Sequence, residues 1–592
     1  MNYVKKIGIF IMIAWMGTVL SMAAERERPT GVKDNQAVPV ALIGDKFLIA
    51  AEPNTTYIEK MAVEFHPSGA LYVMFKAQNN ETKKHYVDLY KYDGVKSTFV
   101  KHISETDLRA YECDMDITVD GFIHCVWVEA ANPNAPTHYI RYRYFDGINW
   151  SPVQTLRTLQ IDGEASGHNL EKVDDIRLSV DNDGNLFVAY MIWPAGRCQT
   201  FSRFGTTIYL DPFPFVGRSK HVAVAADDRY VHIGWMGMEG NYGIYYARRN
   251  KVPNAPWTTV IKVIEPLLAP PDRPFIGVGS DQVPQLLYLK GLEGGGREIH
   301  HRSFRNNKFS DPHFVSDTLV GTFHQPRMAV VDSNNLIVTS QIWAGGARTY
   351  YNWMKDGKWS GLITHNRSKA VEANCGVDLT PTGIAALGFT TGGAVEAALS
   401  GPLVINDMPV AVITVDKETI FWGETVNMSS AGSYDPDGTI VGYEWKIVQD
   451  GITIPGATAS YTFNKSYNNV KIRLTAIDNK GGRGVAEKVI KVNALYTAPS
   501  TVTKKKIQTL LYNKEGNVIE WTPNPKNEEL GYTIVKYKIS RKASDSTEWV
   551  ELAEVGADRR SFADVAIEAG TSYVYAVSAV DDQARMSPYD NY

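Results

Sequence analysis

The feature that most constrains this chain is a hairpin that recurs seven times. In each copy, two short strands of largely apolar residues flank a polar turn, as in residues 176–180, the turn at 181–184 and residues 186–188. The turns lie at residues 66–69, 120–121, 181–184, 227–228, 280–281, 332–334 and 381–383. Their mean spacing of about 52 residues is close to the ~40–50 residues of a propeller blade.

Each unit also carries further strands after its hairpin, such as the aromatic run at residues 139–144. Four strands per unit is the composition of a blade. A β-helix would have a much shorter period, and two packed sandwiches would not repeat this evenly. We therefore predict an all-β chain with a seven-bladed β-propeller over residues 38–405. The seventh unit lacks an outer strand, and the apolar residues 38–42 and 47–50 are expected to complete it and so remove free edges.

Two of the outer turns carry a tryptophan. Asp146-Gly147-x-x-Trp150 and Asp356-Gly357-x-Trp359 keep the turn and the indole of the Asp box, but not its full spacing. Residues 38–405 thus resemble the sialidase-like group of propellers with BNR-type repeats. No position matches that family's arginine triad, so no sialidase residues are carried over.

The N-terminus has the pattern of a signal peptide. Lys5 and Lys6 precede an apolar run at residues 7–20, and Ser21-Met22-Ala23 predicts cleavage after Ala23. The alternative, a membrane anchor, requires about 20 apolar residues, and here the charged residues 25–28 follow the run at once. We expect a signal peptide at residues 1–23 and a secreted, extracellular or cell-surface protein that is not integral to the membrane.

Charge and cysteine content exclude several classes of protein. The net charge of −4 gives no basic footprint for nucleic acid. The four cysteines form no disulfide framework and match no zinc spacing. Cys113 and Cys125 flank the turn at residues 119–121. They are compatible with a disulfide across the hairpin and equally with two buried thiols.

Residues 406–494 contain a second pattern. Ser-Tyr-Asp-Pro-Asp-Gly-Thr-Ile at 433–440, a Tyr-Glu-Trp strand that ends at Trp445, and Asp-Asn-x-Gly-Gly at 478–482 resemble a polycystic-kidney-disease (PKD) module. The resemblance implies a β-sandwich with Trp445 in its core, used as a spacer or adhesion unit. Some such modules bind calcium, which prefers oxygen ligands on turns. The candidate ligands are Asp435, Asp437, Asp478 and Asn406, and the alternative is that these carboxylates cap their own turns.

Residues 496–592 resemble a fibronectin type III module. Trp521 is the early core tryptophan, and Tyr573 in the strand at 570–581 is the expected tyrosine corner, with its hydroxyl bonded back to the chain. Tyr573, Tyr575, Val577 and Ala579 alternate and are expected to share one buried face. Such modules serve as tethers or docking units.

The candidate ligand site rests on histidines near the innermost strands. The sequence has no Gly-x-Ser-x-Gly, His-Glu-x-x-His or P-loop motif. His168, His221 and His324 each precede a repeated hairpin, and Arg327 follows the last of them. Because innermost strands surround the channel of a propeller, these four residues are predicted to meet at its mouth. The alternative is that the histidines bond to loop carbonyls.

Two functions follow from these patterns. The first is a secreted binding or adhesion protein whose propeller presents a site for an extracellular carbohydrate or surface protein. The second is a secreted carbohydrate-active enzyme, a polysaccharide lyase or a glycoside hydrolase. The absence of an acid/base motif favours the first, and the His/Arg cluster favours the second. A hydrolase needs two carboxylates about 5–10 Å apart, and no pair stands out in the sequence. No cofactor besides calcium is expected.

Overall fold

The chain divides into two compact units, Met1–Ile405 and Asn406–Tyr592, which are described separately. A computed structural model describes residues 43–51, 55–105, 107–132, 135–160, 172–193, 196–215, 217–238, 242–264, 271–292, 296–316, 323–343, 347–365, 373–391, 394–464, 469–508, 513–568 and 570–589. The predicted signal peptide and residues 38–42 lie outside these ranges. None of the helices within them is long and apolar enough to span a membrane.

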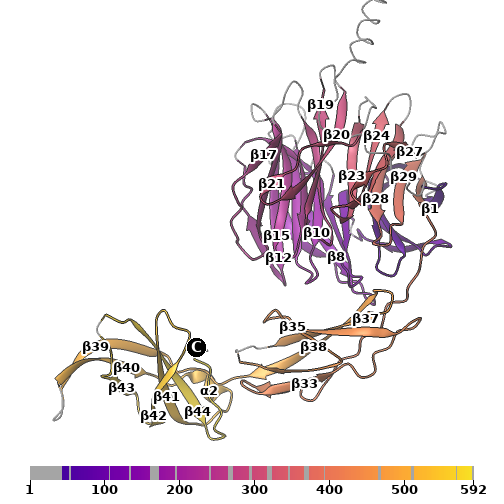
Figure 1. Cartoon of the computed structure of the whole chain (residues 1–592). Coiled ribbons are helices and arrows are strands. Elements are labelled where there is room, and N and C mark those ends of the chain that lie inside the picture. The colour runs from indigo at the N-terminus through magenta and orange to yellow at the C-terminus, as the bar shows by residue number, and fades with distance from the viewer. Residues whose placement is uncertain are drawn as a thin grey trace, which may run out of the picture. The chain divides into compact units, whose positions relative to one another are not determined.

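The N-terminal unit is built, over its described residues, from seven small antiparallel sheets (Figure 1). Six of the sheets follow chain order: β2 (Thr55–Phe65), β3 (Leu71–Asn79), β4 (His85–Tyr92), β5 (Ser97–His102); β6 (Arg109–Ile117), β7 (Ile123–Ala130), β8 (Thr137–Phe145), β9 (Gln154–Gln160); β10 (Lys172–Val180), β11 (Leu186–Trp193), β12 (Arg197–Phe204), β13 (Thr207–Asp211); β14 (Ser219–Ala226), β15 (Tyr230–Gly237), β16 (Gly243–Asn250), β17 (Ile261–Ile264); β18 (Asp272–Val278), β19 (Pro284–Gly291), β20 (Arg297–Arg305), β21 (Lys308–Phe309), with β22 (His313–Phe314) also on β20; and β23 (Phe323–Asp332), β24 (Asn335–Trp343), β25 (Ala347–Lys355), β26 (Lys358–Trp359), with β27 (Ile363–Thr364) also on β25.

The remaining sheet joins the two ends of this unit. It contains β28 (Ala373–Leu379), β29 (Ala385–Thr391) and β30 (Ala394–Leu399), and its outer strand is β1 (Phe47–Ala51). Phe47 pairs with Ala397, and Figure 1 shows the indigo β1 beside the orange β29. The expectation that an N-terminal segment completes this sheet is therefore confirmed for residues 47–51.

The repeated turns join the first and second strands of each sheet. In the turn after β10, the Asp181 carboxylate accepts hydrogen bonds from the amides of Asp183 and Asn185, both at 2.9 Å. Gly184 has a φ of 75°, which L side chains rarely adopt. The turn chemistry read from the sequence thus fixes where each first strand ends.

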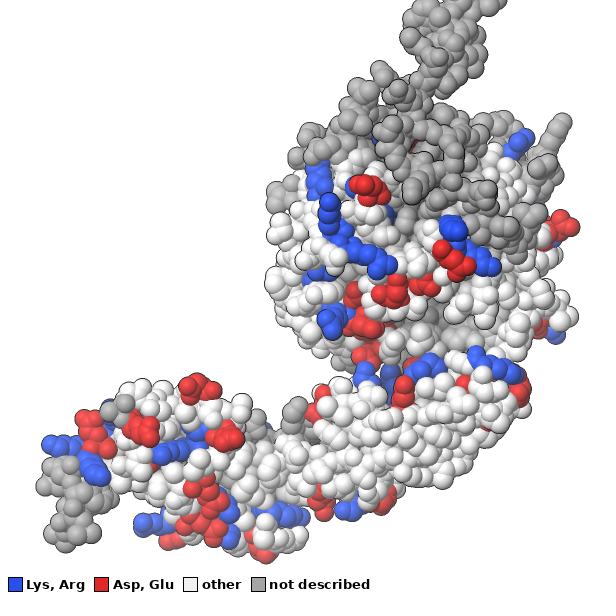
Figure 2. All heavy atoms as spheres, viewed as in Figure 1, with Lys and Arg blue, Asp and Glu red and all other residues white. Residues whose placement is uncertain are grey.

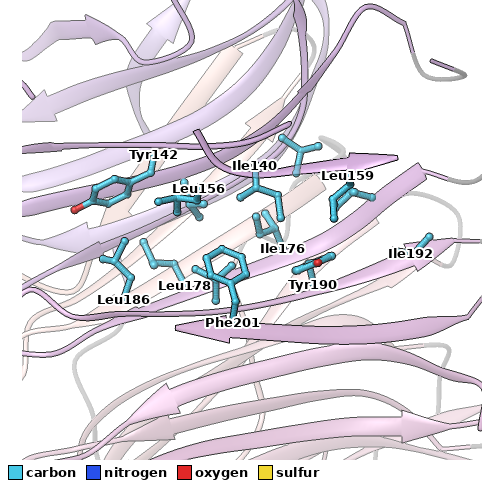
Figure 3. Close-up of a cluster of buried hydrophobic side chains, with 14 residues drawn as sticks. Ile140, Tyr142, Leu156, Leu159, Ile176, Leu178, Leu186, Tyr190, Ile192 and Phe201 are labelled. Atoms are coloured by element: carbon cyan, nitrogen blue, oxygen red, sulfur yellow. The ribbon is translucent and has the colours of Figure 1, made fainter. Parts of the chain in front are cut away.

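Apolar side chains fill the space between neighbouring sheets. One cluster combines Ile140, Tyr142 and Leu156 from one sheet with Leu186 and Phe201 from the next (Figure 3). The second strand β7 is buried along its whole length, because a sheet lies against each of its faces. Repeated apolar strands therefore become the cores between sheets.

Cys113 and Cys125 are thiols rather than a disulfide. Cys113 and Cys125 are free and buried, and the pairing register sets Cys113 opposite Trp127 and Cys125 opposite Met115. The two cysteines are offset along the hairpin, so of the two alternatives the structure bears out the buried thiols. Cys198 is also a free buried thiol.

The C-terminal unit is also almost entirely β, with one short helix, α2 (Pro525–Glu529), in its described residues. Its strands form four sheets: β31 (Thr414–Val415), β33 (Thr425–Ser429), β36 (Thr458–Thr462); β32 (Thr419–Phe421), β38 (Arg483–Asn493), β37 (Val470–Asp478), β34 (Ile440–Ile447), β35 (Ile452–Pro455); β39 (Ser500–Gln508), β40 (Asn513–Trp521), β43 (Ser561–Asp564); and β42 (Val550–Gly556), β41 (Ile534–Ala543), β44 (Tyr573–Asp581).

The core residues predicted for this unit are confirmed. Trp445 is fully buried and packs in one cluster with the flanking strands. Trp521 lies in a second cluster together with Tyr575, Val577 and Ala579, and Tyr573 packs at its edge. The Tyr573 hydroxyl accepts a hydrogen bond from the Glu568 amide at 3.4 Å, so it does bond back to the chain.

Candidate functional site

A central cavity of about 250 Å³ lies among the first strands of the sheets in the N-terminal unit. All seven of these strands, β2, β6, β10, β14, β18, β23 and β28, contribute lining residues. The charged side chains in the lining are Glu64, Asp114, Asp116, Arg177, Arg327 and Asp378. The cavity is thus a polar chamber on the common axis of the sheets.

Each first strand is irregular on the side of the cavity away from its hairpin turn. The pairing register shifts at Glu59/Met61, Ala110/Glu112, Asp174/Arg177, Lys220/Val222, Asp272/Phe275, His324/Arg327 and Ala373/Gly376. Such bulges re-aim side chains and are common beside active sites. We call this irregular end of the seven strands the mouth.

The first strands of three consecutive sheets, β10, β14 and β18, carry strained backbone at the mouth. Asp175, His221 and Arg273 have φ values of 54°, 50° and 47°, and each precedes the end of its strand by the same number of residues. A left-handed conformation costs a non-glycine residue about 1–2 kcal/mol. Strain of this kind concentrates at functional sites, which makes these three positions the first place to look for a ligand.

His221 lies between two carboxylates at the mouth. Its Nδ1 is 3.3 Å from Asp175 Oδ2, and its Nε2 is 3.3 Å from Asp272 Oδ1. The second oxygen of each carboxylate holds an arginine. Arg177 contacts Asp175 at 2.6 Å and Arg297 contacts Asp272 at 2.9 Å. Side chains from strands β10, β14, β18 and β20 are therefore tied into one network.

The charges of this network keep Asp272 ionised. Burial by itself would raise the pKa of this carboxyl. The positive charges of His221, Arg273, Lys220 and Arg297 outweigh burial, so the pKa of Asp272 lies below its usual range. The ionised carboxylate orients the imidazole of His221 and balances part of the positive charge around it.

The mouth offers its ligand two kinds of group. The two ring nitrogens of His221 can donate or accept hydrogen bonds. The guanidinium groups can hold an anionic group in a bidentate geometry. On the face visible in Figure 2, Lys and Arg alternate with Asp and Glu, so positive charge is not spread broadly over that face.

The carboxylates inside the cavity have a different role. Asp114, Asp116 and Asp378 accept hydrogen bonds from the backbone amides of Leu178, Val180 and Phe65 at 2.9, 2.7 and 2.6 Å. Every one of these bonds joins the first strands of two neighbouring sheets. The three aspartates therefore act as latches between sheets.

Burial of these carboxyls favours their neutral form. It is the main cause that raises the pKa of Asp378 to about 7 and that of Asp116 to about 6. The pKa of Glu64 is also raised, mainly by burial and then by the negative charges of Asp378, Asp116 and Asp114. The carboxyl groups that line the cavity thus stay protonated to a higher pH than exposed carboxyl groups do.

The structure places only some of the four residues that were predicted to meet at the mouth. His221 lies at the mouth between Asp175 and Asp272, and Arg327 lines the cavity with its guanidinium 5.8 Å from the Phe275 ring centre. His324 belongs to β23 at the start of its bulge, and its side chain is not described. His168 lies outside the described residues. Their convergence therefore stays a prediction.

Sequence reasoning missed the acidic partners of His221. Asp175 and Asp272 come from the two neighbouring sheets, and only the bulges bring them to the imidazole. One usable signal exists, because Pro274 and Pro326 stand in the bulges of two successive units. Proline inside a strand marks a bulge or an edge.

The candidate calcium ligands lie near one end of the β34 and β37 strands. Asp478 Oδ2 accepts a hydrogen bond from Asn406 at 2.7 Å, and its Oδ1 accepts from the amides of Lys480 and Gly482. Asp437 pairs with Lys480. Asn406 Oδ1 and Asp435 Oδ2 are buried oxygens without a hydrogen-bond partner. Across the described residues, no group of three or more His, Cys, Asp or Glu side chains is arranged to hold a metal.

Comparison with known proteins assigns one part of the chain. Residues 406–493 match the family model of the PKD domain, so the predicted PKD module is confirmed. Eighty-eight residues are 38% identical to collagenase ColA of Clostridium perfringens (strain 13 / Type A). That match covers 15% of this chain and 8% of the collagenase.

Three solved structures are similar to part of this chain. An α-L-arabinanase of Penicillium chrysogenum has 13% identity and a TM-score of 0.37, over 60% of this chain and 98% of its own. An ulvan lyase has 10% identity and a TM-score of 0.38, over 60% and 93%. A fucose-specific lectin of Aleuria aurantia has 13% identity and a TM-score of 0.33, over 54% and 98%. At these values no function is carried over from them to this chain.

Proposed function

We propose that the N-terminal unit is a seven-bladed β-propeller that binds an acidic carbohydrate at its mouth. The protein that carries it is exported by a signal peptide at residues 1–23 and acts outside the cell or at its surface. The PKD domain and a fibronectin type III-like module at residues 496–592 hold the propeller away from its attachment. Binding to an extracellular carbohydrate, rather than catalysis, is the primary function.

The observation that carries this proposal is the strained network around His221. Three successive bulges aim Asp175, His221 and Arg273 at the mouth, and the backbone there is less stable than a regular strand would be. An imidazole and several guanidinium groups stand together beside a polar cavity. A sugar that carries a carboxylate or sulfate offers the hydroxyl groups and the negative charge that these groups bind.

The test compares two histidine variants of the full chain on an array of acidic and neutral glycans. His221→Gln removes the imidazole but keeps a polar side chain, and we expect at least a tenfold loss of affinity for acidic glycans, as for loss of one hydrogen bond to a charged group. His102→Gln is the matched control, because His102 is 65% exposed on the outer strand β5. Equal affinity of the His221→Gln variant and the wild-type protein would contradict the proposal.

One observation favours an enzyme as a second candidate. Asp175 holds Nδ1 of His221 and so orients the imidazole, and a substrate that displaces Asp272 from Nε2 would leave that nitrogen free to act as a general base. In a lyase reaction on a uronate, the base removes the proton next to the carboxylate, the glycosidic C–O bond breaks, and the leaving oxygen takes up a proton from water. A carbon–carbon double bond forms, while arginines neutralise the carboxylate. Product analysis on every glycan that binds decides between the two, because a lyase leaves a product with ultraviolet absorbance from its conjugated double bond.

The PKD domain is proposed to bind calcium through Asn406 and Asp435, with Asp437 and Asp478 nearby. The proposal is supported by the two buried oxygens that have no hydrogen-bond partner, Asn406 Oδ1 and Asp435 Oδ2. Ca²⁺ accepts amide and carboxylate oxygens of this kind. A ligand that binds only the folded state raises the unfolding temperature, so calcium should stabilise this domain and a chelator should reverse the effect. An Asp435→Asn variant that responds to calcium like the wild type would contradict this assignment.

A further inference from the structure

A second pocket of about 450 Å³ lies in the N-terminal unit near the mouth. We call it the seam pocket and define it by Arg157, Arg197, Leu210, Asp211, Phe213 and Phe215, which line it together with Ser219. Its walls come from three successive sheets, since Arg157 lies on β9, Arg197 on β12 and Ser219 on β14. No residue of the seam pocket lines the central cavity.

The seam pocket and the mouth share strand β14. Ser219 lines the pocket and its Oγ accepts a hydrogen bond from the Cys198 amide at 3.0 Å. Lys220 and His221 follow directly on the same strand. Two residues of a strand span about 6.6 Å. The bulge at Lys220/Val222 makes this an upper bound on the backbone separation of Ser219 at the pocket wall and His221 at the mouth.

The charge of the seam pocket suits an anion. Arg157 and Arg197 are its two basic lining residues, and Asp211 is its one acidic lining residue. The Asp211 carboxylate is already paired, because Arg249 contacts it at 2.8 Å from the buried side. The pocket lining thus carries two basic side chains and one acidic side chain.

The pocket also contains a rigid aromatic wall. The ring centres of Phe213 and Phe215 lie 5.1 and 5.8 Å from that of Trp235, and Phe215 lies 4.9 Å from Tyr245. Both phenylalanines are only partly buried, so one side of each ring is held while part of it remains accessible. A pyranose ring has an apolar C–H face that packs on aromatic rings, and an acidic sugar adds the anion that arginine binds.

We propose that the seam pocket is a subsite for a further acidic sugar unit, beyond the reach of a disaccharide, of the chain that His221 binds. This inference rests on the proposed function, because it assigns the ligand as an acidic oligosaccharide that extends from the mouth across the seam between sheets. The mouth holds one unit, and Arg157 and Arg197 hold the anionic group of a unit farther along. Affinity then depends on the length of the oligosaccharide.

The experiment measures the binding of two uronate oligosaccharides, digalacturonate and hexagalacturonate, to the full-length protein. A sulfated galactan hexasaccharide serves as a third probe. The variants are Arg157→Gln and Arg197→Gln. Arg229→Gln is the matched control, because Arg229 is exposed in the turn at the opposite end of β14 and loses the same charge. Unfolding temperatures are recorded for each variant so that a folding defect is recognised.

We expect each seam-pocket variant to bind a hexasaccharide about tenfold more weakly, as for loss of a charge-assisted bond, and to bind the disaccharide unchanged. If the variants lose affinity only for the sulfated hexasaccharide, the bound anion is a sulfate. If they lose affinity only for the uronate hexasaccharide, it is a carboxylate. Hexasaccharide affinities within twofold of the control, or equal losses for short and long probes, overturn the inference, as does failure of both hexasaccharides to bind the wild type.

The result also separates this inference from the proposed function. If His221→Gln binds both lengths normally while Arg157→Gln loses the hexasaccharide, the mouth is not the primary site and the seam pocket stands by itself. If His221→Gln loses all probes and the seam-pocket variants lose none, the mouth stands and the subsite is refuted.

Discussion

The two ends of the seven first strands differ in both backbone and charge. At the turn end six of the seven strands keep their pairing register, and the half-buried carboxylates of Asp116 and Asp378 accept hydrogen bonds from amides of the next sheet. At the mouth every strand bulges, and His221 lies among ionised side chains. The repeat therefore builds the scaffold, and the departures from the repeat build the candidate site.

This contrast separates stability from binding. Buried apolar contacts and latches at the turn end favour one closed arrangement of the sheets. Strained residues at the mouth work against stability and are retained in a place where a ligand can use them. Substitutions at the two ends should therefore have different consequences, and three measurements can test this.

The largest effect is expected from the core beside a turn. Leu186 is fully buried next to the turn after β10, in the cluster shown in Figure 3. Leu186→Ala should lower the free energy of unfolding by about 2–5 kcal/mol, because it leaves a cavity. Calorimetry of the full chain measures the loss, and glycan affinity of the folded protein should not change. A selective loss of affinity would break the comparison.

The next effect concerns the protons held at the turn end. In the unfolded chain Asp378 should titrate near pH 4, whereas in the folded protein its pKa is raised to about 7. The folded state therefore binds more protons between these values, so stability falls as pH rises from about 4 to about 7 and stays lower above that.

Asp378→Asn keeps an acceptor for the Phe65 amide and removes this titration. We expect the variant to be more stable than the wild type at pH 8, on the order of 1–3 kcal/mol, and to match it near pH 4. Urea unfolding at both pH values measures the difference, with the exposed Asp311→Asn as control. If the free energy of unfolding has the same pH dependence in Asp378→Asn and the wild type, the pKa of Asp378 is not raised by folding.

The smallest effect concerns left-handed backbone at the two ends. His221→Gly should be more stable than His221→Ala by about 1 kcal/mol, because both remove the imidazole but only glycine relieves the φ of 50°, and both should lose binding. Gly121→Ala at the turn end should destabilise the protein by a similar amount, because Gly121 has a φ of 81° and an added Cβ would lie 2.6 Å from His66 Nε2. Thermal unfolding of the three variants measures both differences, and equal stability of His221→Gly and His221→Ala would refute the strain at the mouth.

Much of the scaffold could be predicted because it repeats. The turn at residues 181–184 and its six counterparts predicted the hairpins. The missing outer strand after β30 indicated that the N-terminal segment completes the last sheet. In the PKD domain, Trp445 was identifiable as the core residue from its motif alone. These features depend on local patterns or on a period, both of which a single sequence displays.

The candidate site could be predicted only in part. His221 was found because it precedes a repeated turn, but its partners Asp175 and Asp272 were not, since a bulge shifts register without a strong sequence mark. Glu64 and Asp378 are remote in the chain and come together only because β2 and β28 are neighbours around the cavity. Such contacts follow from ring closure, which no local pattern encodes.

The pairing of β1 with β30 has a consequence for the timing of folding. Phe47 must wait for Ala397, its partner some 350 residues later in the chain. At a synthesis rate of ~5–20 residues per second, that wait lasts roughly 20–70 s. During this time an unpaired strand edge is exposed, which is a hazard for aggregation. In a chain truncated before β30, the edge of β1 would stay unpaired. The last sheet can therefore close only when the whole N-terminal unit has been synthesised.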